Sequence, residues 1–335
     1  MKQIAVMGSG SWGTALALLL HKNGHHVNLW SFTKEENEIL KETRENLKYL
    51  PGVLIPNQIG LTHNIEEAVK NADAIVIAIP SRFMRDNILA FAPYIKKEQI
   101  IVNVSKGLEE ETLLRLSEVI QEILPDNPIA VLSGPSHAEE LARDIPTTCV
   151  VASVSLRTSE IVQDIFMSPK FRVYTNSDII GVELGGALKN VMALAAGISD
   201  GLGFGDNTKA ALMTRGIVEI TRLGLAMGAQ LQTFSGLSGI GDLIVTCTSL
   251  HSRNRRAGIL IGQGKSLEET LQEIHMVVEG VHTAKAALAF CKKYEVEMPI
   301  VQEINKVLFE SKNPKKAVVD LMMRSRTEEQ DITHL

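Results

Sequence analysis

The first half of the chain alternates short apolar runs with segments of helical periodicity. The first five runs are four to six residues long and rich in Ile, Val or Ala, as expected of strands buried on both faces of a sheet. We predict strands at Ile4–Met7, Val27–Trp30, Ala74–Ile79, Ile100–Val104, Ile129–Leu132, Thr148–Val154 and Phe171–Tyr174. Helical patterns lie between them, for example at Thr14–Lys22, Leu113–Leu124 and Ser159–Met167. This alternation predicts an α/β domain with a mostly parallel, doubly wound sheet.

Long helical segments replace the strands beyond about residue 178. The helices predicted there are Ile179–Ile198, Lys209–Met227, Ser266–Leu271, Thr283–Tyr294 and Val301–Glu310. A length of 335 residues agrees with two domains of roughly 150 residues each. We therefore predict an α/β domain over residues 1–180 and an all-α domain over residues 181–335.

Composition and charge exclude several classes of protein. Hydrophobic residues make up 45% and charged residues 22% of the chain, the balance of a folded globular protein. A net charge of −5 argues against broad electrostatic binding to nucleic acid or anionic membranes. The three cysteines lie far apart, which favours a reducing compartment. The chain contains no run of about 18 consecutive apolar residues, so we predict no membrane span. We expect a cytoplasmic protein.

A glycine-rich turn follows the first predicted strand and opens a predicted helix. From Gly8 to Gly13 it reads Gly-Ser-Gly-Ser-Trp-Gly, the pattern G-x-G-x-x-G in its required context. Gly8 would allow the tight turn, Gly10 the close approach of a pyrophosphate, and Gly13 the packing of helix on strand. Backbone N–H groups near Ser11 and Trp12 would hold the diphosphate at the positive helix end. We predict a Rossmann-type dinucleotide-binding domain, the alternative being a glycine turn without a ligand.

The acidic residue that binds the ribose hydroxyls of NAD, expected about 20 residues further on, is missing from this pattern. The second predicted strand is followed by Ser31-Phe32-Thr33-Lys34, and the first carboxylate is that of Glu35. A carboxylate at the ribose would repel a 2′-phosphate, whereas its absence beside Lys34 makes NADP acceptable. NADP, or both NADP and NAD, is the cofactor that this pattern favours.

Lys189 lies in the middle of the helix predicted at Ile179–Ile198, which is apolar almost all round and should be buried. A buried lysine needs a partner or a function, because desolvation penalises its charged form and lowers its pKa. The alternative is that Lys189 extends from the helix to solvent. The pattern alone leaves both interpretations open.

Further candidates lie between residues 238 and 256. The stretch Ser238–Leu243 is glycine-rich and holds a lone acid, Asp242. It is followed by Arg253, Arg255 and Arg256 at a predicted helix start. Guanidinium groups and the free N–H groups of a helix start suit a small dianion such as phosphate. A solvated basic face is the alternative, and we expect it for Arg255 and Arg256.

Two loops follow strands of the predicted sheet, Ser105–Gly107 and Ser133–Ala138. In open α/β sheets, ligands bind outside the carboxyl ends of the strands. Lys106 is therefore placed to meet a substrate, whereas an average loop lysine would only be solvated.

Other chemistries have little support. No His/Cys set has zinc spacing, so we predict no metal site. Cys247 and His251 are four residues apart, but nothing orients them as a nucleophile and its base. Aromatic residues make up only 4% of the chain, which argues against base-stacking surfaces for nucleic acid.

Seven strings that include these candidates occur in one order along the chain. They are Gly8-Ser-Gly-Ser-Trp-Gly-Thr-Ala-Leu16, Ser105-Lys-Gly107, Ser133-Gly-Pro-Ser136 with Ala138-Glu139, Gly186-Ala-Leu-Lys-Asn-Val191, Gly239-Ile-Gly-Asp-Leu243, Ser252-Arg-Asn254 and Val278-Glu-Gly280. Each string is modest alone, but the set resembles the bacterial NAD(P)-dependent glycerol-3-phosphate dehydrogenases over nearly the whole chain. The resemblance implies reversible reduction of dihydroxyacetone phosphate to sn-glycerol 3-phosphate with NAD(P)H, which supplies glycerophospholipid synthesis.

The resemblance also implies roles for individual residues. Lys189 matches the proton acceptor. The positions that match substrate contacts are Lys106, Gly134, Ser136, Lys189, Asp242, Ser252, Arg253 and Asn254. The positions that match cofactor contacts are Ser11, Trp12, Lys106, Ala138, Arg253, Val277 and Glu279, beside the motif glycines Gly8, Gly10 and Gly13. Phe32 departs from the family, whose members often carry a polar or basic residue there.

Elementary chemistry agrees with these roles. Oxidation of an alcohol by hydride transfer needs a base for the hydroxyl proton, and a lysine serves best with a pKa near 7–8. Burial and the charge of Lys106 would lower the pKa of Lys189, and Asp242 would raise it. Arg253, with Asn254, would hold the phosphate and so orient the substrate.

Two alternative functions agree with part of these patterns. One is a related two-domain dehydrogenase for a hydroxy acid or hydroxyacyl thioester, against which the phosphate site at Arg253 argues. The other is a dinucleotide-sensing regulatory module without turnover, in which Lys189 and Asp242 would have no purpose. The oligomeric state is left open, with a homodimer as one alternative.

Overall fold

The computed structural model describes residues 1–326, 328 and 329, which divide into two compact units. Unit 1 comprises Met1–Ser105 and Leu116–Ile179, and unit 2 comprises Lys106–Arg115 and the chain from Ile180 onward. The predicted fold class is confirmed, since unit 1 is an α/β domain and the chain beyond it is helical. The segment Lys106–Arg115 belongs to unit 2 although, in chain order, it lies between two strands of unit 1.

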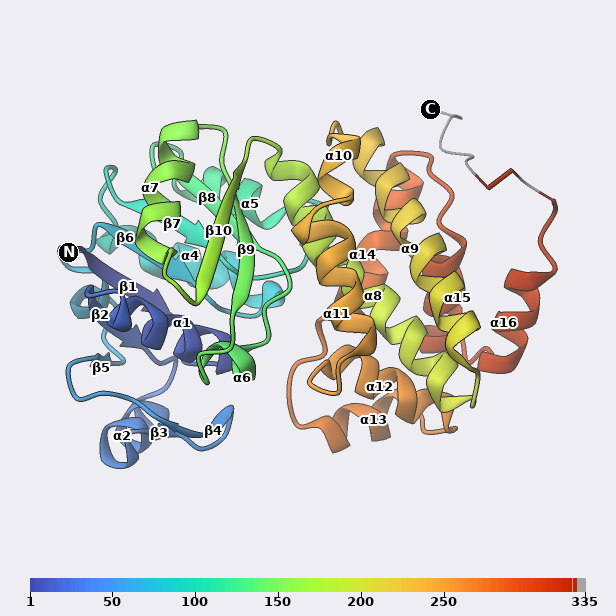
Figure 1. The fold of residues 1–335 in the computed structure, drawn as a ribbon, viewed down its shortest axis with the longest axis horizontal. Coiled ribbons are helices and arrows are strands. Elements are labelled where there is room, and N and C mark those ends of the chain that lie inside the picture. The colour runs from blue at the N-terminus through green and yellow to red at the C-terminus, as the bar shows by residue number, and fades with distance from the viewer. Residues whose placement is uncertain (327, 330–335) are drawn as a thin grey trace. The chain divides into compact units, whose positions relative to one another are not determined.

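Unit 1 is built on an eight-stranded sheet (Figure 1). Its strands are β1 (Gln3–Met7), β2 (His26–Trp30), β5 (Gly60–Thr62), β6 (Ala74–Ile77), β7 (Ile100–Asn103), β8 (Ile129–Ser133), β9 (Thr147–Ala152) and β10 (Phe171–Asn176). Their order is β10-β9-β8-β7-β6-β1-β2-β5, and all neighbours are parallel except β8 and β9. From β5 to β8 the order is that of the dinucleotide-binding doubly wound fold, with β1 at the centre.

Helices cover both faces of this sheet. They are α1 (Ser11–Lys22), α2 (Lys34–Thr43), α3 (Ile65–Val69), α4 (Met84–Phe91), α5 (Leu116–Ile123), α6 (Ala138–Leu141) and α7 (Leu156–Phe166), with short 3-10 turns at Ser81–Phe83 and Ala92–Tyr94. Alternate strand residues such as Ile4 and Val6 pack with α1, α6 and α7 in one hydrophobic cluster. Ala5 and Met7 are equally buried but face the other way, the side on which α4 and α5 pack together. Burial on both faces explains why the central strands β1, β6, β7 and β8 are almost continuously apolar.

Three short strands were not predicted from the sequence. A hairpin of β3 (Glu45–Asn46) and β4 (Leu50–Leu54) follows α2, and β5 adds an edge strand beside β2. Runs of two to five residues that are partly polar show no usable periodicity. The helix predicted at Thr14–Lys22 begins earlier, at Ser11, inside the glycine motif.

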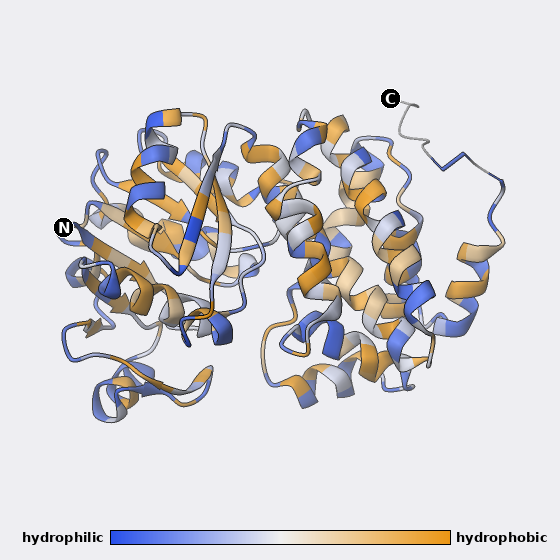
Figure 2. Ribbon diagram, in the orientation of Figure 1, coloured by the Kyte–Doolittle hydropathy of each residue, from blue (hydrophilic) through white to orange (hydrophobic). Residues whose placement is uncertain are grey.

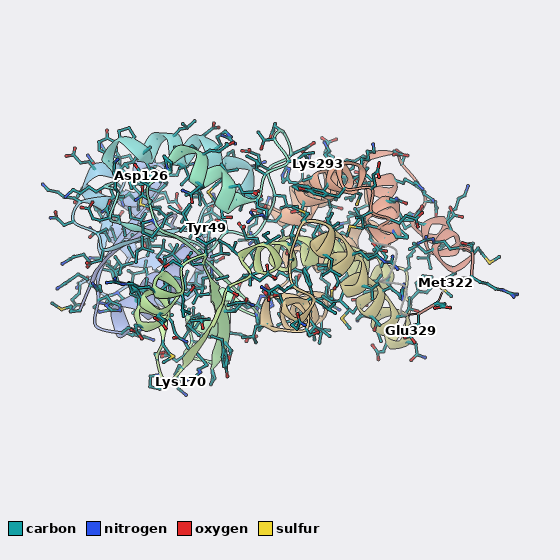
Figure 3. All side chains as sticks on the ribbon, turned by 90° about the horizontal axis from the view of Figure 1, so that it is seen from above. Tyr49, Asp126, Lys170, Lys293, Met322 and Glu329 are labelled. Atoms are coloured by element: carbon teal, nitrogen blue, oxygen red, sulfur yellow. The ribbon has the colours of Figure 1, made fainter. Side chains whose placement is uncertain are left out.

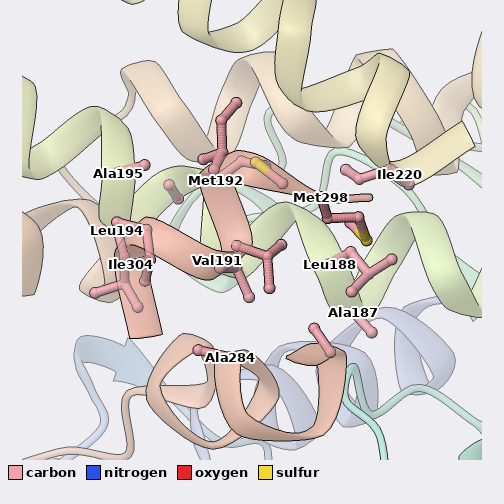
Figure 4. Packing of buried hydrophobic residues seen from close by; sticks show 14 of the residues in the cluster. Ala187, Leu188, Val191, Met192, Leu194, Ala195, Ile220, Ala284, Met298 and Ile304 are labelled. Carbon is pink, nitrogen blue, oxygen red and sulfur yellow. The ribbon is translucent and has the colours of Figure 1, made fainter. Parts of the chain in front are cut away.

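From Ile180 onward the regular elements of unit 2 are all helices over the described residues. Its helices are α8 (Ile179–Gly201), α9 (Asp206–Ala226), α10 (Leu231–Phe234), α11 (Asp242–Thr248), α12 (Arg253–Gly262), α13 (Leu267–Ile274), α14 (Glu279–Lys293), α15 (Pro299–Phe309) and α16 (Pro314–Met322), with a π-turn at Leu237–Gly241 before α11. Hydrophobic residues lie along the sheet strands of unit 1 and the inner sides of these helices (Figure 2). The core of unit 2 surrounds α8, where Leu188 and Val191 pack with Ala284 of α14 and Ile304 of α15 (Figure 4).

Helix α8 confirms the prediction of a buried helix, since every residue from Gly181 to Ser199 is buried. Among the described residues it alone is long and apolar enough to cross a membrane, but 89% of its most apolar window is buried inside the protein. It is therefore the core helix of unit 2. Glycines allow α12 to approach it closely, because a Cβ at Gly197 would meet the backbone of Arg255 and one at Gly258 would meet that of Leu194.

Candidate functional site

The glycine motif of unit 1 forms a cradle at the start of α1. Gly8 has a φ of +126°, its N–H donates to the Trp30 carbonyl at 3.1 Å, and a Cβ there would meet the backbone of Ala78. A Cβ at Gly13 would meet the backbone of Gly8, so strand and helix need both glycines to pack. The space beside Gly10 is open, and no side chain caps the N-terminus of α1 there. Uncapped N–H groups at a helix N-terminus, with open space beside Gly10, fit a dinucleotide diphosphate.

Buried polar contacts hold this cradle in shape. The Asn46 amide donates to the Ser9 carbonyl at 2.7 Å and to the Thr14 hydroxyl at 2.8 Å. The Ser9 hydroxyl donates to the Glu36 carboxylate at 2.9 Å. Sequence reasoning singled out neither Asn46 nor Glu36, because both lie in the region of α2 and the β3–β4 hairpin, which carries no recognisable motif.

Three other predicted positions, Gly134, Ser136 and Ala138, follow β8 in unit 1. Gly134 has a φ of +139°, and a Cβ there would crowd the backbone of Cys149, so this turn requires glycine. The Ser136 hydroxyl donates to the Gly134 carbonyl at 2.9 Å. Ala138 is the first residue of α6. The structure thus places all three on one turn at the carboxyl end of a strand.

Asp242 of unit 2 joins the two predicted lysines. Its carboxylate is inaccessible to solvent and accepts from the ammonium of Lys189 through Oδ1 and from that of Lys106 through Oδ2, the latter at 2.6 Å. Lys189 also donates to the Thr246 hydroxyl at 2.7 Å. Its side chain is only 8% exposed, so the alternative in which it extends to solvent is wrong.

The pKa of Lys189 reflects this environment. Burial lowers it from 10.5 to about 7, the negative charge of Asp242 opposes that shift, and the positive charge of Lys106 adds to it. These are the three influences named from the sequence. A lysine in this state can hold or release a proton near neutral pH.

The segment Lys106–Arg115 is anchored to α8 by contacts beyond Lys106 in the chain. Leu108 and Arg115 form an antiparallel bridge, and Leu108 is buried in the core of unit 2. The guanidinium of Arg115 donates to the carboxylate of Glu183, on α8, at 2.5 Å, and both side chains are at most 10% exposed. The segment that carries Lys106 is thereby fixed to the helix that carries Lys189.

The predicted residues at the start of α12 form a second group in unit 2. The Ser252 hydroxyl caps this helix, accepting from the Arg255 N–H at 3.2 Å. Arg253 donates to the Val277 carbonyl at 3.1 Å. The Asn254 amide donates to the Asn190 side chain at 2.9 Å, and its oxygen accepts from the Gly280 N–H at 2.9 Å. Since Asn190 adjoins Lys189 on α8, and Gly280 adjoins Glu279 at the start of α14, these contacts connect the group with the lysine pair.

The two remaining arginines of this cluster differ from each other. Arg256 is exposed, as expected. The prediction of a solvated Arg255 is wrong, because its side chain is 12% exposed and its guanidinium donates to the carboxylate of Asp200 at 2.7 and 2.8 Å. The close crossing of α8 and α12 brings these side chains together, which a local pattern does not reveal.

The geometry also argues against a cysteine nucleophile. Burial raises the pKa of the Cys247 thiol to about 12, which keeps it protonated and unreactive. Within the described part of the chain, no group of three or more His, Cys, Asp and Glu side chains is arranged to hold a metal ion. The buried lysine pair is therefore the part of unit 2 best suited to proton transfer.

Two side chains of the lysine site were missed from the sequence. Thr246 lies one turn after Asp242 on α11, where its hydroxyl also donates to the Asp242 carbonyl at 2.6 Å. Asn190 was seen beside Lys189 but was given no partner. The helical spacing of Asp242 and Thr246 was the only available signal, and it is common to many helices.

The chain is similar to known proteins over nearly its whole length. Residues 3–159 match the family described as NAD-dependent glycerol-3-phosphate dehydrogenase N-terminus, and residues 178–319 match the corresponding C-terminus. The chain is 58% identical over 328 residues to glycerol-3-phosphate dehydrogenase [NAD(P)+] of Fusobacterium nucleatum, covering 97% of this chain and 98% of the relative. It is 52% identical to that of Bacillus subtilis, covering 99% and 97%. The crystal structure of glycerol-3-phosphate dehydrogenase from Coxiella burnetii superimposes with a TM-score of 0.94 at 38% identity, covering 96% of this chain and 99% of that one.

Proposed function

We propose a division of roles among the residues of this chain, which belongs to the family of NAD-dependent glycerol-3-phosphate dehydrogenases. It is an NAD(P)-dependent oxidoreductase that interconverts dihydroxyacetone phosphate and sn-glycerol 3-phosphate, the reaction that supplies glycerophospholipid synthesis. We assign dinucleotide binding to unit 1 and the residues of proton transfer and phosphate binding mainly to unit 2.

The single observation that carries the assignment is the carboxylate of Asp242 between the ammonium groups of Lys189 and Lys106. We assign Lys189 as the group that accepts the proton of the substrate hydroxyl during oxidation and returns it during reduction. A pKa of about 7 suits both directions, because each protonation state is populated near neutral pH. Asp242 and Thr246 hold the Lys189 amine in one position by accepting its hydrogen bonds.

The bound nicotinamide supplies or accepts the hydride. The protein's own part is to hold the reacting carbon still and to move the proton. Arg253 and Asn254 would bind the substrate phosphate, because a guanidinium and an amide at a helix start suit a dianion. Fixing the phosphate restricts the three-carbon substrate and lowers the entropic barrier to reaction. The further substrate contacts that we propose are Lys106, Gly134, Ser136, Asp242 and Ser252.

The cradle at the start of α1 supports the assignment of the cofactor to unit 1. We propose that the N–H groups of Ser11 and Trp12 bind the diphosphate at the positive end of the helix, with Gly8, Gly10 and Gly13 shaping the turn. The further cofactor contacts that we propose are Lys106, Ala138, Arg253, Val277 and Glu279.

A cytoplasmic location is also proposed. Its support is that Cys149, Cys247 and Cys291 are all buried thiols, which suit a reducing compartment. Self-association into a homodimer stays a prediction. The mass of the protein in solution, compared with 36.7 kDa for one chain, would test it.

Replacing Lys189 tests the catalytic assignment. In Lys189→Met the proton acceptor is lost while the apolar stem is kept, so we expect kcat to fall by at least ~10²-fold. Binding of NADH should change little, because the cradle lies in unit 1. Steady-state kinetics and direct titration with NADH measure the two quantities separately.

Lys170→Met, which removes an exposed lysine after α7, is the control and should keep normal turnover. Normal kcat in Lys189→Met would remove Lys189 from the mechanism. Loss of NADH binding together with turnover would instead indicate a general structural effect, and circular dichroism of both variants would show it.

A further inference from the structure

A carboxylate lies against the glycine motif where the sequence pattern showed none. The hydroxyl of Ser9, the residue after Gly8, donates to Oε1 of Glu36 at 2.9 Å. Ser9 is only 4% exposed, and Glu36 is partly buried. The contact therefore fixes the Glu36 carboxylate beside the turn that would hold the cofactor.

The start of α2 explains how Glu36 reaches this place. The Thr33 hydroxyl caps α2 by accepting from the Glu36 N–H at 3.1 Å, which places Glu36 in the first helical turn. The Gly8 N–H donates to the carbonyl of Trp30, the last residue of β2, at 3.1 Å. The glycine motif and the end of β2 are thus adjacent, and the first turn of α2 directs Glu36 back toward the motif rather than outward.

We propose that Glu36 is the residue by which this enzyme distinguishes NADH from NADPH, in favour of NADH. A dinucleotide fold places the adenosine ribose between the glycine motif and the end of its second strand, where an acidic residue accepts the ribose hydroxyls. Glu36 occupies that place about 20 residues after the motif. Its second carboxylate oxygen can accept a ribose hydroxyl, whereas the negative charge repels a 2′-phosphate. The inference rests on the binding of NAD(P) by unit 1 and names the preferred form.

The cations nearby reduce this repulsion without removing it. Lys34 is exposed, and its Nζ lies 3.6 Å from Oε1 of Glu38, one helical turn further along α2. Lys48 is exposed and rests over the ring of Tyr49, which is labelled in Figure 3. The contact with Tyr49 chiefly, and the charge of Glu36 to a smaller extent, raise the pKa of Lys48. The solvated ammonium of Lys48, near Glu36, partly offsets the repulsion between Glu36 and a 2′-phosphate. NADPH is therefore a weaker ligand rather than an excluded one, in agreement with a family that uses both cofactors.

Binding of the dinucleotide without its nicotinamide tests the proposal without turnover. ADP-ribose and 2′-phospho-ADP-ribose differ only in the group that Glu36 would sense, and calorimetry gives both dissociation constants on one preparation. We expect the wild-type protein to bind ADP-ribose more tightly. In Glu36→Gln the ratio of the two affinities should move toward the phosphorylated ligand by about tenfold, since one repulsive charge has been removed.

The matched control is Glu35→Gln, which removes an exposed carboxylate from the same helical turn and should leave the ratio unchanged. Ser9→Ala removes the anchor of Glu36 but keeps its charge, so its ratio should fall between those of wild type and Glu36→Gln. The ratio of the two dissociation constants, measured on one preparation, does not depend on the fraction of that protein that is folded. High salt should weaken the preference of the wild-type protein for ADP-ribose over 2′-phospho-ADP-ribose, because added ions screen charge repulsion. It should not change the relative affinity of Glu36→Gln for the two ligands.

An unchanged ratio in Glu36→Gln overturns the proposal, as does tighter binding of 2′-phospho-ADP-ribose by the wild type. In either case binding of both ligands would leave the assignment of unit 1 intact. If neither ligand binds the wild-type protein, the assignment of dinucleotide binding to unit 1 fails as well. Steady-state kcat/KM for NADH and NADPH with dihydroxyacetone phosphate should follow the affinity ratio in all four proteins.

Discussion

Single charges determine the chemistry at the residue scale. Asp242 is fully buried between two lysines, and the charges of Asp242 and Lys106 both act on Lys189. Removing Asp242 would leave the buried Lys189 without its charged partner, which costs more than the loss of an exposed ion pair, whereas removing either lysine leaves Asp242 paired with the other. The pKa of Lys189 is therefore a property of the whole group.

Replacement of Lys106 should shift the pH dependence of the reaction. The positive charge of Lys106 lowers the pKa of Lys189, so Lys106→Met should raise that pKa. For glycerol 3-phosphate oxidation, which needs neutral Lys189, the rise of kcat/KM with pH should then move to higher pH. The measurement is the pH profile of kcat/KM in this direction.

Lys106→Arg is the control for this shift, because it keeps the positive charge and should keep the profile in place even if affinity for the substrate falls. A Lys106→Met profile with the wild-type midpoint would show that Lys106 does not tune Lys189.

At the element scale, a buried carboxyl group joins two helices of unit 2. Glu219 of α9 accepts the N–H groups of Ile300 at 2.8 Å and Val301 at 3.4 Å, in the first turn of α15. It joins two helices of unit 2 and caps one of them. Burial raises the pKa of this carboxyl to about 8, although the two N–H groups oppose the shift.

This raised pKa predicts how stability depends on pH. Between about pH 4.5 and pH 8 the folded protein keeps a proton on Glu219 that the unfolded chain releases, so the free energy of unfolding falls as pH rises. Glu219→Gln cannot titrate, and its stability relative to wild type should increase across this window by on the order of a few kcal/mol. Urea denaturation at a series of pH values measures the difference.

Glu310→Gln, at the exposed end of α15, provides the comparison and should follow the wild-type curve. A constant difference between Glu219→Gln and wild type over the whole window would mean that Glu219 is ionised in the folded protein.

Two separate cores characterise the molecule as a whole. The cluster around α1 and the sheet lies within unit 1, and the cluster around α8 lies within unit 2. Both tryptophans, Trp12 and Trp30, belong to unit 1, whereas the longest helices, α8 and α9, belong to unit 2. Tryptophan fluorescence therefore reports on unit 1, and helical circular dichroism is weighted toward unit 2.

ADP-ribose should separate these two signals during thermal unfolding. At 100 times its dissociation constant a ligand adds about 2.7 kcal/mol to the state that binds it. For a unit of this size we expect the fluorescence midpoint to rise by roughly 5–10 °C. The circular dichroism midpoint should rise less, because the glycine cradle that would hold the diphosphate lies in unit 1 and unit 2 supplies fewer of the proposed cofactor contacts. Equal shifts in both signals would show that the two units unfold as one.

Much of the fold and part of the site followed from local sequence patterns. All seven predicted strands exist. The central strands were recognisable because burial on both faces makes them continuously apolar, whereas the edge strand β10 buries alternate residues. The glycine motif was recognisable because Gly8 and Gly13 meet backbone atoms that exclude any side chain. The burial of α8 also followed from its residues, since an apolar helix of this length has no polar face to present to solvent, but the pattern left open whether the Lys189 side chain is buried with it.

Tertiary structure alone decided which of these elements meet. It placed Lys106 with unit 2, joined Lys106 and Lys189 through Asp242, paired Arg255 with Asp200, and turned Glu36 toward Ser9. Periodicity records whether a residue faces the core or solvent, because burial is repeated at every turn or every second residue. A contact between one side chain and another far along the chain leaves no such repeat, since it depends on the path of the whole backbone between them.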